Sequence, residues 1–187
     1  MPLILHLKIT GIMKISAVSR NPTYYDVYIN QVADLDLSEA LRQSLAVMDG
    51  LDLKKLHALG DQVYAPGKWT LREVFQHIAD CERVFAYRAL RFGRGETTEL
   101  PGFDEGVFAK NAGADRRSLE EILAELRCVR QSTMMLFNAF DEAALRRTGV
   151  MSKTEVSVLS IGFTLIGHQN HHMKIIEERY FPLLQTV

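Results

Sequence analysis

The sequence predicts an all-α protein that folds as an antiparallel four-helix bundle with a long crossover loop. Three observations lead to this expectation. Four long segments carry apolar residues at helical spacing. No segment shows a convincing alternation of apolar and polar residues, which would be typical of a strand. The connection from Gly93 to Gly113 is long enough to be a non-trivial crossover between two helices of the bundle.

Length and composition fit one globular domain, with 47% hydrophobic and 24% charged residues. The formal net charge is -1 and no basic block occurs, so we expect no nucleic-acid partner. Cys81 and Cys128 are the only cysteines, which predicts no disulfide framework and a reducing, cytoplasmic location. The apolar stretch at residues 3–9 is too short to span a bilayer and lacks the features of a signal peptide, so we expect no membrane association.

The first 20 residues are assigned to an N-terminal extension, and residues 21–187 to the single bundle domain. Met13-Lys14-Ile15-Ser16 looks like a fresh start of the chain. We therefore expect residues 1–12 to be either an over-called start or a loosely held extension. The intact mass of the native protein distinguishes these possibilities.

Helical spacing and capping residues predict the elements of the first third of the chain. A short aromatic segment around Tyr28 has helical spacing. Asp36-Leu37-Ser38-Glu39 has the spacing of a capping box, although Asp replaces the usual Ser or Thr, and the helix that follows is expected to reach about Asp49. Residues 52–57 are consistent with one further short turn of helix.

The second long helix is expected between a loop at residues 64–69, which contains Pro-Gly, and about Phe92. Thr70-Leu71-Arg72-Glu73 is a proper capping box at its start. His77, near the middle of this helix, is expected to point inward because it shares a face with apolar residues. Taken alone, a single inward histidine is more often a hydrogen-bonded core residue than a metal ligand. The residues that share its face are Val74, Cys81, Val84 and Arg88.

The third long helix begins with the capping box Ser118-Leu119-Glu120-Glu121 and is expected to end near Phe140. Residues 141–149 are interpreted as a turn with at most one turn of helix, and residues 150–158 contain a polar break. The fourth helix is expected to start around Ser157 and to end before Pro182, because proline cannot continue it. In the crossover, Phe103 or Asp104 is a candidate to cover a site, but an exposed connection is an equally good interpretation.

The fourth helix carries the most informative pattern, because His168 and His172 are four residues apart and project from one face. That face is apolar, and one divalent metal ion would supply a partner to both buried imidazoles. The pair alone favours a metal no more than it favours one core and one surface histidine. His77 adds a third imidazole from a facing helix, and three histidines match a site that leaves positions for water or substrate. His171 lies about 60° off the face and is placed at the rim, whereas His6 and His57 are interpreted as surface residues.

Five segments stand out in order along the chain: Pro66-Gly67-Lys68-Trp69-Thr70, His77-Ile78-Ala79-Asp80, Glu82-Arg83-Val84-Phe85-Ala86-Tyr87-Arg88, Leu100-Pro101-Gly102-Phe103-Asp104 and Gly167-His168-x-x-x-His172. Taken together in this order, they resemble the DinB/YfiT-like superfamily. The resemblance covers roughly residues 24–184 and implies a four-helix bundle with nickel, zinc or a similar divalent ion held by His77, His168 and His172. Known members include thiol S-transferases that use bacillithiol, mycothiol-dependent isomerases and metal-dependent hydrolases, and dimers are frequent. The resemblance therefore implies a small-molecule substrate, a low-molecular-weight thiol as a candidate cofactor, and a homodimer.

Further site residues follow from their position around His77. Asp80, three residues on, is a candidate to orient the ligand or to act as a catalytic base, although a solvated carboxylate is the commoner outcome. Arg88 is the candidate cofactor-binding residue because it shares the face of His77. Cys81 is interpreted as a small core residue, since the family pattern has no cysteine ligand there. Glu82 and Arg83 are expected to form salt bridges.

Three functions remain open on the sequence. The first is an enzyme, a metal-dependent thiol S-transferase acting on small electrophiles, with a metal-dependent hydrolase as the alternative. The second is a metal-binding stress-response protein without turnover. The third is a structural bundle whose histidines are ordinary core residues.

Overall fold

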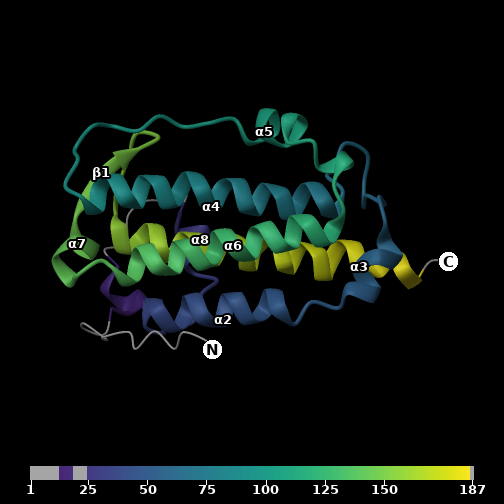
Figure 1. Ribbon diagram of the computed structural model, residues 1–187, viewed down its shortest axis with the longest axis horizontal. Helices are drawn as coiled ribbons and strands as arrows, with labels where there is room; N and C mark the ends of the chain where they lie inside the picture. Colours follow the sequence, from purple (N-terminus) through teal and green to yellow (C-terminus); the bar gives the residue numbers. More distant parts are fainter. Residues whose placement is uncertain (1–12, 19–24, 186–187) are drawn as a thin grey trace.

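The computed structural model describes residues 13–18 and 25–185. Four long helices, α2 (Leu37–Asp49), α4 (Leu71–Gly93), α6 (Leu119–Asn138) and α8 (Val158–Ile175), form a bundle (Figure 1). The fold-class prediction of a four-helix bundle is confirmed. The shorter helices are α1 (Asp26–Ile29), α3 (Leu53–Leu59), α5 (Glu105–Asn111) and α7 (Glu142–Arg146), with 3-10 turns at η1 (Ile15–Ala17), η2 (Ala114–Arg116) and η4 (Phe181–Gln185). A π-helical segment, η3 (Ile176–Tyr180), continues α8.

The crossover sets the topology of the bundle. α4 packs against α6 and α8, and α2 packs against the same two helices. In Figure 1, α2 and α8 run from left to right, whereas α4 and α6 both run from right to left. α4 and α6 can run in the same direction because the crossover that connects them returns the chain along the outside of the bundle. The crossover was expected to be a loop throughout, but its middle part forms α5, whose N-terminus is capped by the side chain of Asp104. α4 and α8, which carry the predicted histidines, are neighbours and run in opposite directions.

Two of the three predicted capping boxes are present. At the start of α4 and of α6, Thr70 with Glu73 and Ser118 with Glu121 exchange the reciprocal hydrogen bonds. The box expected at Asp36–Glu39 does not form. The Asp36 carboxylate instead accepts from the backbone N–H of Ser38 at 2.9 Å and from that of Met13 at 2.9 Å.

The expectation that the chain contains no strand is wrong for residues 148–157. β1 (Thr148–Met151) and β2 (Thr154–Ser157) form an antiparallel hairpin. Its two turn residues, Ser152 and Lys153, have φ of 51° and 66°. Such turns usually carry Asn-Gly, so the Ser-Lys pair gives no recognisable signal in the sequence. The crossover lies along this hairpin, where Leu100 accepts from the backbone N–H of Ser152 at 3.0 Å and donates its own to Val150 at 2.9 Å.

A buried polar layer divides the hydrophobic core into two clusters. One cluster lies around Phe85, Phe137 and Phe163, and the other around Phe75 and Leu126. Each long helix contributes one side chain to a polar network between them. These residues are Ser44 of α2, Glu82 of α4, Arg130 of α6 and Gln169 of α8.

The centre of that network is an ion pair. Arg130 donates from Nε and Nη2 to the two carboxylate oxygens of Glu82 at 2.7 and 2.8 Å, and from Nη1 to the Ser44 hydroxyl. Gln169 donates to the Ser44 carbonyl at 2.8 Å. The predicted salt bridge of Glu82 is therefore made with α6, while Arg83 pairs with Asp80 and Glu125. The three candidate metal ligands lie beside this layer.

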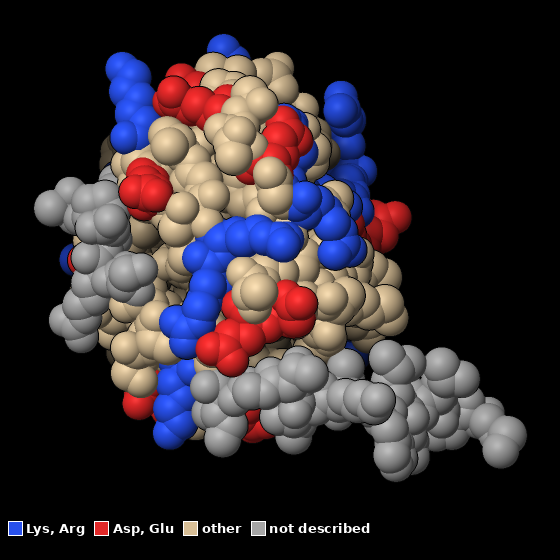
Figure 2. Space-filling view, turned by 90° about the vertical axis from the view of Figure 1, so that its left-hand side faces the viewer, with Lys and Arg blue, Asp and Glu red and all other residues tan. Residues whose placement is uncertain are grey.

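Residues 13–18, which the sequence assigns to the N-terminal extension, contact the bundle, because Met13 and Val18 are buried in the larger cluster. The expectation for residues 1–12 lies outside the described residues. Within the described ranges, no helix combines the length and the apolar character needed to cross a membrane. Figure 2 views the end of the molecule where α7 and the hairpin lie, and it shows Lys and Arg side chains interspersed with Asp and Glu.

Candidate metal centre

Three histidine side chains converge between α4 and α8. His77 comes from the first half of α4, and His168 and His172 come from successive turns of α8. The Nε2 atom of His168 lies 3.1 Å from Nε2 of His77 and 3.2 Å from Nε2 of His172. All three residues are buried, with exposed fractions of 4%, 4% and 8% for His77, His168 and His172. The sequence expectation that two distant segments bring three imidazoles together therefore agrees with the geometry.

The donor set fits a divalent metal ion. One ligand atom from each histidine lies within 4.8 Å of the others. Nitrogen ligands bonded at about 2.0–2.1 Å to one ion are separated by roughly 2.8–3.4 Å, from octahedral to tetrahedral geometry. The two Nε2–Nε2 separations fall in this range, and three imidazoles leave coordination positions open for a further ligand.

Burial keeps the three imidazoles neutral, which is the form that binds metals. It lowers the pKa of His77 to about 4 and, with His77 and His171 nearby, lowers that of His172 to about 3. The pKa of His168 is also lowered, first by burial and then by its histidine neighbours and Arg130. At neutral pH each ring therefore has a nitrogen lone pair, and the centre has no positive charge of its own to repel a cation.

A close approach of α1 to α8 places an aromatic ring on the centre. A Cβ atom at Gly167 would lie 2.0 Å from the carbonyl oxygen of Tyr28, so only glycine permits this contact. Tyr28 then packs edge-on against His168 and His171, with ring centroids 5.3 and 5.5 Å apart. Gly167 of the predicted Gly-His-x-x-x-His pattern is thus explained by packing next to the first histidine of α8.

Two neighbours orient His77. The sulfur of Cys81, one turn further along α4, lies 3.5 Å from Nδ1 of His77. The same sulfur lies 3.7 Å from Nε2, so it packs against the imidazole ring and limits its rotation. On the other side, the indole of Trp69 packs against the His77 ring with centroids 4.7 Å apart. Cys81 is buried as predicted, but its contact with the ligand goes beyond the role of core filler.

An aromatic pocket of about 340 Å³ opens onto His172. Its walls include Tyr64, Trp69 and Tyr180, with Lys68 and Ile175 beside them. The Tyr180 hydroxyl donates to the carbonyl of Trp69, and burial raises the pKa of this phenol to about 12, so it remains a donor at neutral pH. The π-helical segment η3 carries Tyr180 into this position. Sequence reasoning did not assign Tyr64 and Tyr180 to the site, because no local pattern shows that they meet.

Asp80, the predicted catalytic base, contacts Gln76 and Arg83. Its carboxylate accepts from Nε2 of Gln76 at 3.0 Å and pairs with Arg83. Arg83 and Arg117 both pair with Glu125, and Arg117 also donates to Gln76, which closes a ring of polar contacts on α4 and α6. Burial raises the pKa of Asp80 above its ordinary value. No contact between Asp80 and the three histidines is found among the described residues, so its catalytic role stays a prediction.

Arg88 is buried on α4, but it faces a separate cavity three turns from His77. The remaining histidines behave as expected where they are described: His171 is partly buried at the rim, and His57 is exposed and pairs with Glu120. His6 lies outside the described residues. Asn170 does not reach the histidines and donates to the carbonyl of Gln31, which anchors the chain after α1.

Comparison with known proteins identifies the family and the fold. A family model described as the DinB superfamily matches residues 36–176, well over half of the chain. A solved structure of YfiT from Bacillus subtilis aligns with a TM-score of 0.63 at 18% sequence identity, covering 88% of this chain and 93% of that one. It is described as "a probable metal-dependent hydrolase with an unusual four-helix bundle topology". At that identity the likeness establishes the fold. No curated protein matches the sequence.

Proposed function

This chain belongs to the DinB superfamily, and from that premise we propose that it is a metal-dependent enzyme acting on a small molecule. His77, His168 and His172 would hold the metal, with nickel or zinc as the expected ion. The observation that carries the proposal is the convergence of three buried Nε2 atoms with separations of 3.1 and 3.2 Å. Three ordinary core histidines would instead have their own hydrogen-bond partners and would not direct the same nitrogen to one point.

A divalent ion held there supplies Lewis acidity, which lowers the pKa of a coordinated water or thiol towards neutrality. The protein contributes position and exclusion of water. Cys81 and Trp69 hold the His77 ring, and Tyr28 packs on His168. The substrate would enter by the aromatic pocket at His172, whose rings favour an apolar or planar group.

Thiol transfer is the reaction that we propose first. The sulfur of a low-molecular-weight thiol would bond to an electrophilic carbon, the leaving group would depart with the electron pair, and the thiol proton would pass to solvent. Among the described residues no carboxylate joins the cluster formed by the three histidines. Hydrolysis at metal centres commonly uses such a carboxylate as a general base, whereas a thiol that is already ionised needs none. The family members that use bacillithiol or mycothiol support the same choice.

Hydrolysis is the second candidate, and the description of YfiT as a probable metal-dependent hydrolase favours it. A non-catalytic metal-binding protein is the outcome if metal-loaded protein turns over neither class of substrate. To separate these functions, the loaded protein is assayed with thiols and small electrophiles, and in parallel with ester and amide substrates. Thiol-dependent consumption of the electrophile supports transfer, and thiol-independent hydrolysis overturns it.

Metal content tests the centre itself. Protein purified without a histidine tag is expected to contain about one divalent ion per chain, and His77→Ala, His168→Ala and His172→Ala are each expected to lose it. His57→Ala is the matched control, since His57 is exposed and paired with Glu120. If all four variants keep the metal content of the wild type, the centre is not formed by these histidines.

Two further expectations accompany the proposal. The free cysteines, Cys81 buried and Cys128 exposed, support a reducing, cytoplasmic environment. The homodimer implied by the family resemblance is checked by sedimentation equilibrium of the full chain, and a mass equal to that of one chain at all concentrations would contradict it.

A further inference from the structure

A second cavity, of about 360 Å³, lies away from the metal centre. It is built around Arg88, which follows His77 on α4 by eleven residues, or about 16 Å along the helix axis. The other residues that line the cavity are Tyr25, Phe85 of α4, Gly102, Phe103 and Glu105 of the crossover, and Ser152 and Thr154 of the hairpin. A ligand held here would not touch the three histidines, so this cavity requires its own explanation.

The charge of Arg88 is buried without a carboxylate. Its exposed fraction is 3%, and its guanidinium donates to the carbonyl of Pro101 at 2.7 Å and to the sulfur of Met151 at 3.8 Å. The rings of Phe85 and Phe103 lie 5.6 and 5.7 Å from the guanidinium carbon. Within the described ranges no Asp or Glu forms an ion pair with it. A buried cation costs several kcal/mol unless an anion is paired with it. Arg88 has electrostatic contacts with Tyr25 and Cys81, but no carboxylate of the described residues neutralises it.

Arg130 provides the comparison within the same molecule. It is also fully buried, but both edges of its guanidinium are occupied, by the Glu82 carboxylate and the Ser44 hydroxyl. In the core of the bundle, a buried arginine is therefore paired with a carboxylate of the protein itself. Arg88 differs because it lines a cavity, into which an anionic group can enter.

Glu105 brings the opposite charge to the same cavity. Its carboxylate has no ion-pair or hydrogen-bond partner in the described part of the chain, and it is not within ion-pair distance of Arg88. Burial, followed by the neighbouring charge of Asp104, raises the pKa of Glu105 above its ordinary value. Two opposite charges that share a cavity without pairing are complementary to a ligand that carries both charges itself.

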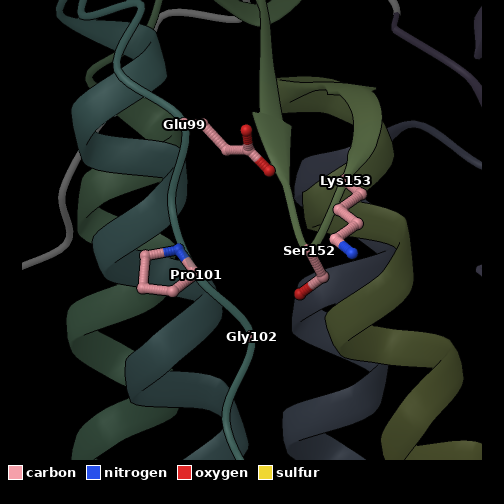
Figure 3. A pocket seen from close by; sticks show the side chains of 5 residues that line it. All are labelled: Glu99, Pro101, Gly102, Ser152 and Lys153. Atoms are coloured by element: carbon pink, nitrogen blue, oxygen red, sulfur yellow. The ribbon is translucent and has the colours of Figure 1, made fainter.

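Backbone contacts hold together the two walls of the cavity that come from the crossover and the hairpin. The crossover is fixed to the hairpin through Leu100, and Gly102 passes so close to Ser152 that a Cβ atom would lie 3.1 Å from its hydroxyl oxygen. Gly102 and Ser152 also line an outer pocket with Glu99, Pro101 and Lys153 (Figure 3). In Figure 3 the side chains of Glu99 and Ser152 lie in the space between the crossover and the hairpin.

We propose that this cavity binds a small zwitterion of the α-amino-acid class. Arg88 receives the carboxylate, Glu105 receives the ammonium group, and an apolar side chain packs against Phe85 and Phe103. A guanidinium is suited to this task because its planar fork matches a carboxylate. The volume is at the lower end of the range for small-molecule sites, which suits one amino acid. The site is independent of the metal centre and of the reaction proposed for it.

Three probes of the same size test the recognition of both charges: L-phenylalanine, 3-phenylpropanoate, which lacks the ammonium group, and 2-phenylethylamine, which lacks the carboxylate. Calorimetric titration of the full chain is expected to give a Kd near or below ~1 mM for phenylalanine. The other two probes are expected to bind at least about tenfold more weakly, since each leaves one buried charge unpaired. Metal-free and metal-loaded protein should give the same values, so failure of the metal proposal does not affect this result.

Variants locate the site. Arg88→Gln and Glu105→Gln are each expected to weaken phenylalanine binding by at least about tenfold. Arg146→Gln and Glu142→Gln are the matched controls, because these residues form an exposed ion pair on α7, and they should bind like the wild type. If Arg88→Gln does not fold, Arg88→Lys, which keeps the charge and loses the fork, is used with Glu105→Gln. The proposal is overturned if phenylalanine shows no saturable binding, if all three probes bind equally, or if the folded variants bind it as the wild type does.

Discussion

At the scale of single residues, the sulfur of Cys81 is the contact that the sequence interpretation undervalued. It lies 3.5 Å from Nδ1 and 3.7 Å from Nε2 of His77, so it packs against the ring that carries a candidate ligand nitrogen. We predict that Cys81→Ala weakens metal binding by about tenfold, because a neighbour that packs against a ligand histidine holds its ring in orientation. The measurement is a competition titration with a chromogenic chelator. Cys128→Ala, at the exposed cysteine, is the control. Equal metal affinities for the two variants would show that the sulfur does not orient the ring.

The buried histidines also predict how the stability of the metal-free protein depends on pH. Their folded-state pKa values, about 4 for His77 and about 3 for His172, lie below the ordinary value of 6.5. The unfolded chain therefore binds more protons in acid. This contribution to stability is complete above pH 6.5 and is lost as the pH falls from there to the folded values. Each histidine lowers the free energy of unfolding by about 1.4 kcal/mol per pH unit across that window.

Urea unfolding of metal-free protein between about pH 7 and pH 5 measures this dependence. His77→Gln and His172→Gln should each show a shallower decline than the wild type, because glutamine does not titrate. His57→Gln, at the exposed ring, should decline as the wild type does. A decline that is unchanged in all three variants would show that the buried histidines do not cause it.

At the scale of elements, the contact between α1 and α8 depends on Gly167. An alanine Cβ there would lie 2.0 Å from the backbone oxygen of Tyr28, so α1 would have to move away from the histidines. We predict that Gly167→Ala lowers the free energy of unfolding by about 1–3 kcal/mol, the usual cost of overpacking. Gly50→Ala is the control, because its Cβ would meet only ordinary contacts from 3.5 Å. Equal denaturation midpoints for the two variants would mean that α1 is not held by this approach.

The elements also show where local sequence signals suffice. The capping boxes at Thr70 and Ser118 were predicted and are present, because each depends on residues only three positions apart. The hairpin was missed, since its strands are four residues long and its Ser152-Lys153 turn adopts left-handed backbone angles without glycine. Its position is stabilised partly by Leu100 of the distant crossover, which no local pattern reveals.

At the scale of the whole molecule, the Glu82–Arg130 ion pair connects the helices across the core. Arg130→Met would leave the Glu82 carboxylate buried, at 2% exposure, without its partner. We predict a loss of about 3–5 kcal/mol in the free energy of unfolding. The double variant Arg130→Met with Glu82→Gln should recover most of it, since no charge is then left unpaired. Chemical denaturation measures both.

The control for this prediction is Arg127→Met on the same helix, which removes an exposed pair with Asp49 and should cost no more than about 1 kcal/mol. A double variant that is no more stable than Arg130→Met alone would contradict the explanation. In that case the loss would come from the missing packing of the long arginine side chain and not from the unpaired carboxylate.

The sequence by itself determined the four long helices, most of their ends and the inward direction of His77, His168 and His172. These features depend on helical periodicity and on neighbours within one or two turns. Tertiary structure alone decided that α4 and α6 run in the same direction and that Arg130 is the partner of Glu82. It also decided that Asp80 bonds to Gln76 and Arg83. The physical reason is separation along the chain. The Nε2 atoms of His77 and His168 meet although 91 positions separate the two residues, and which of many such pairs form depends on how whole helices pack.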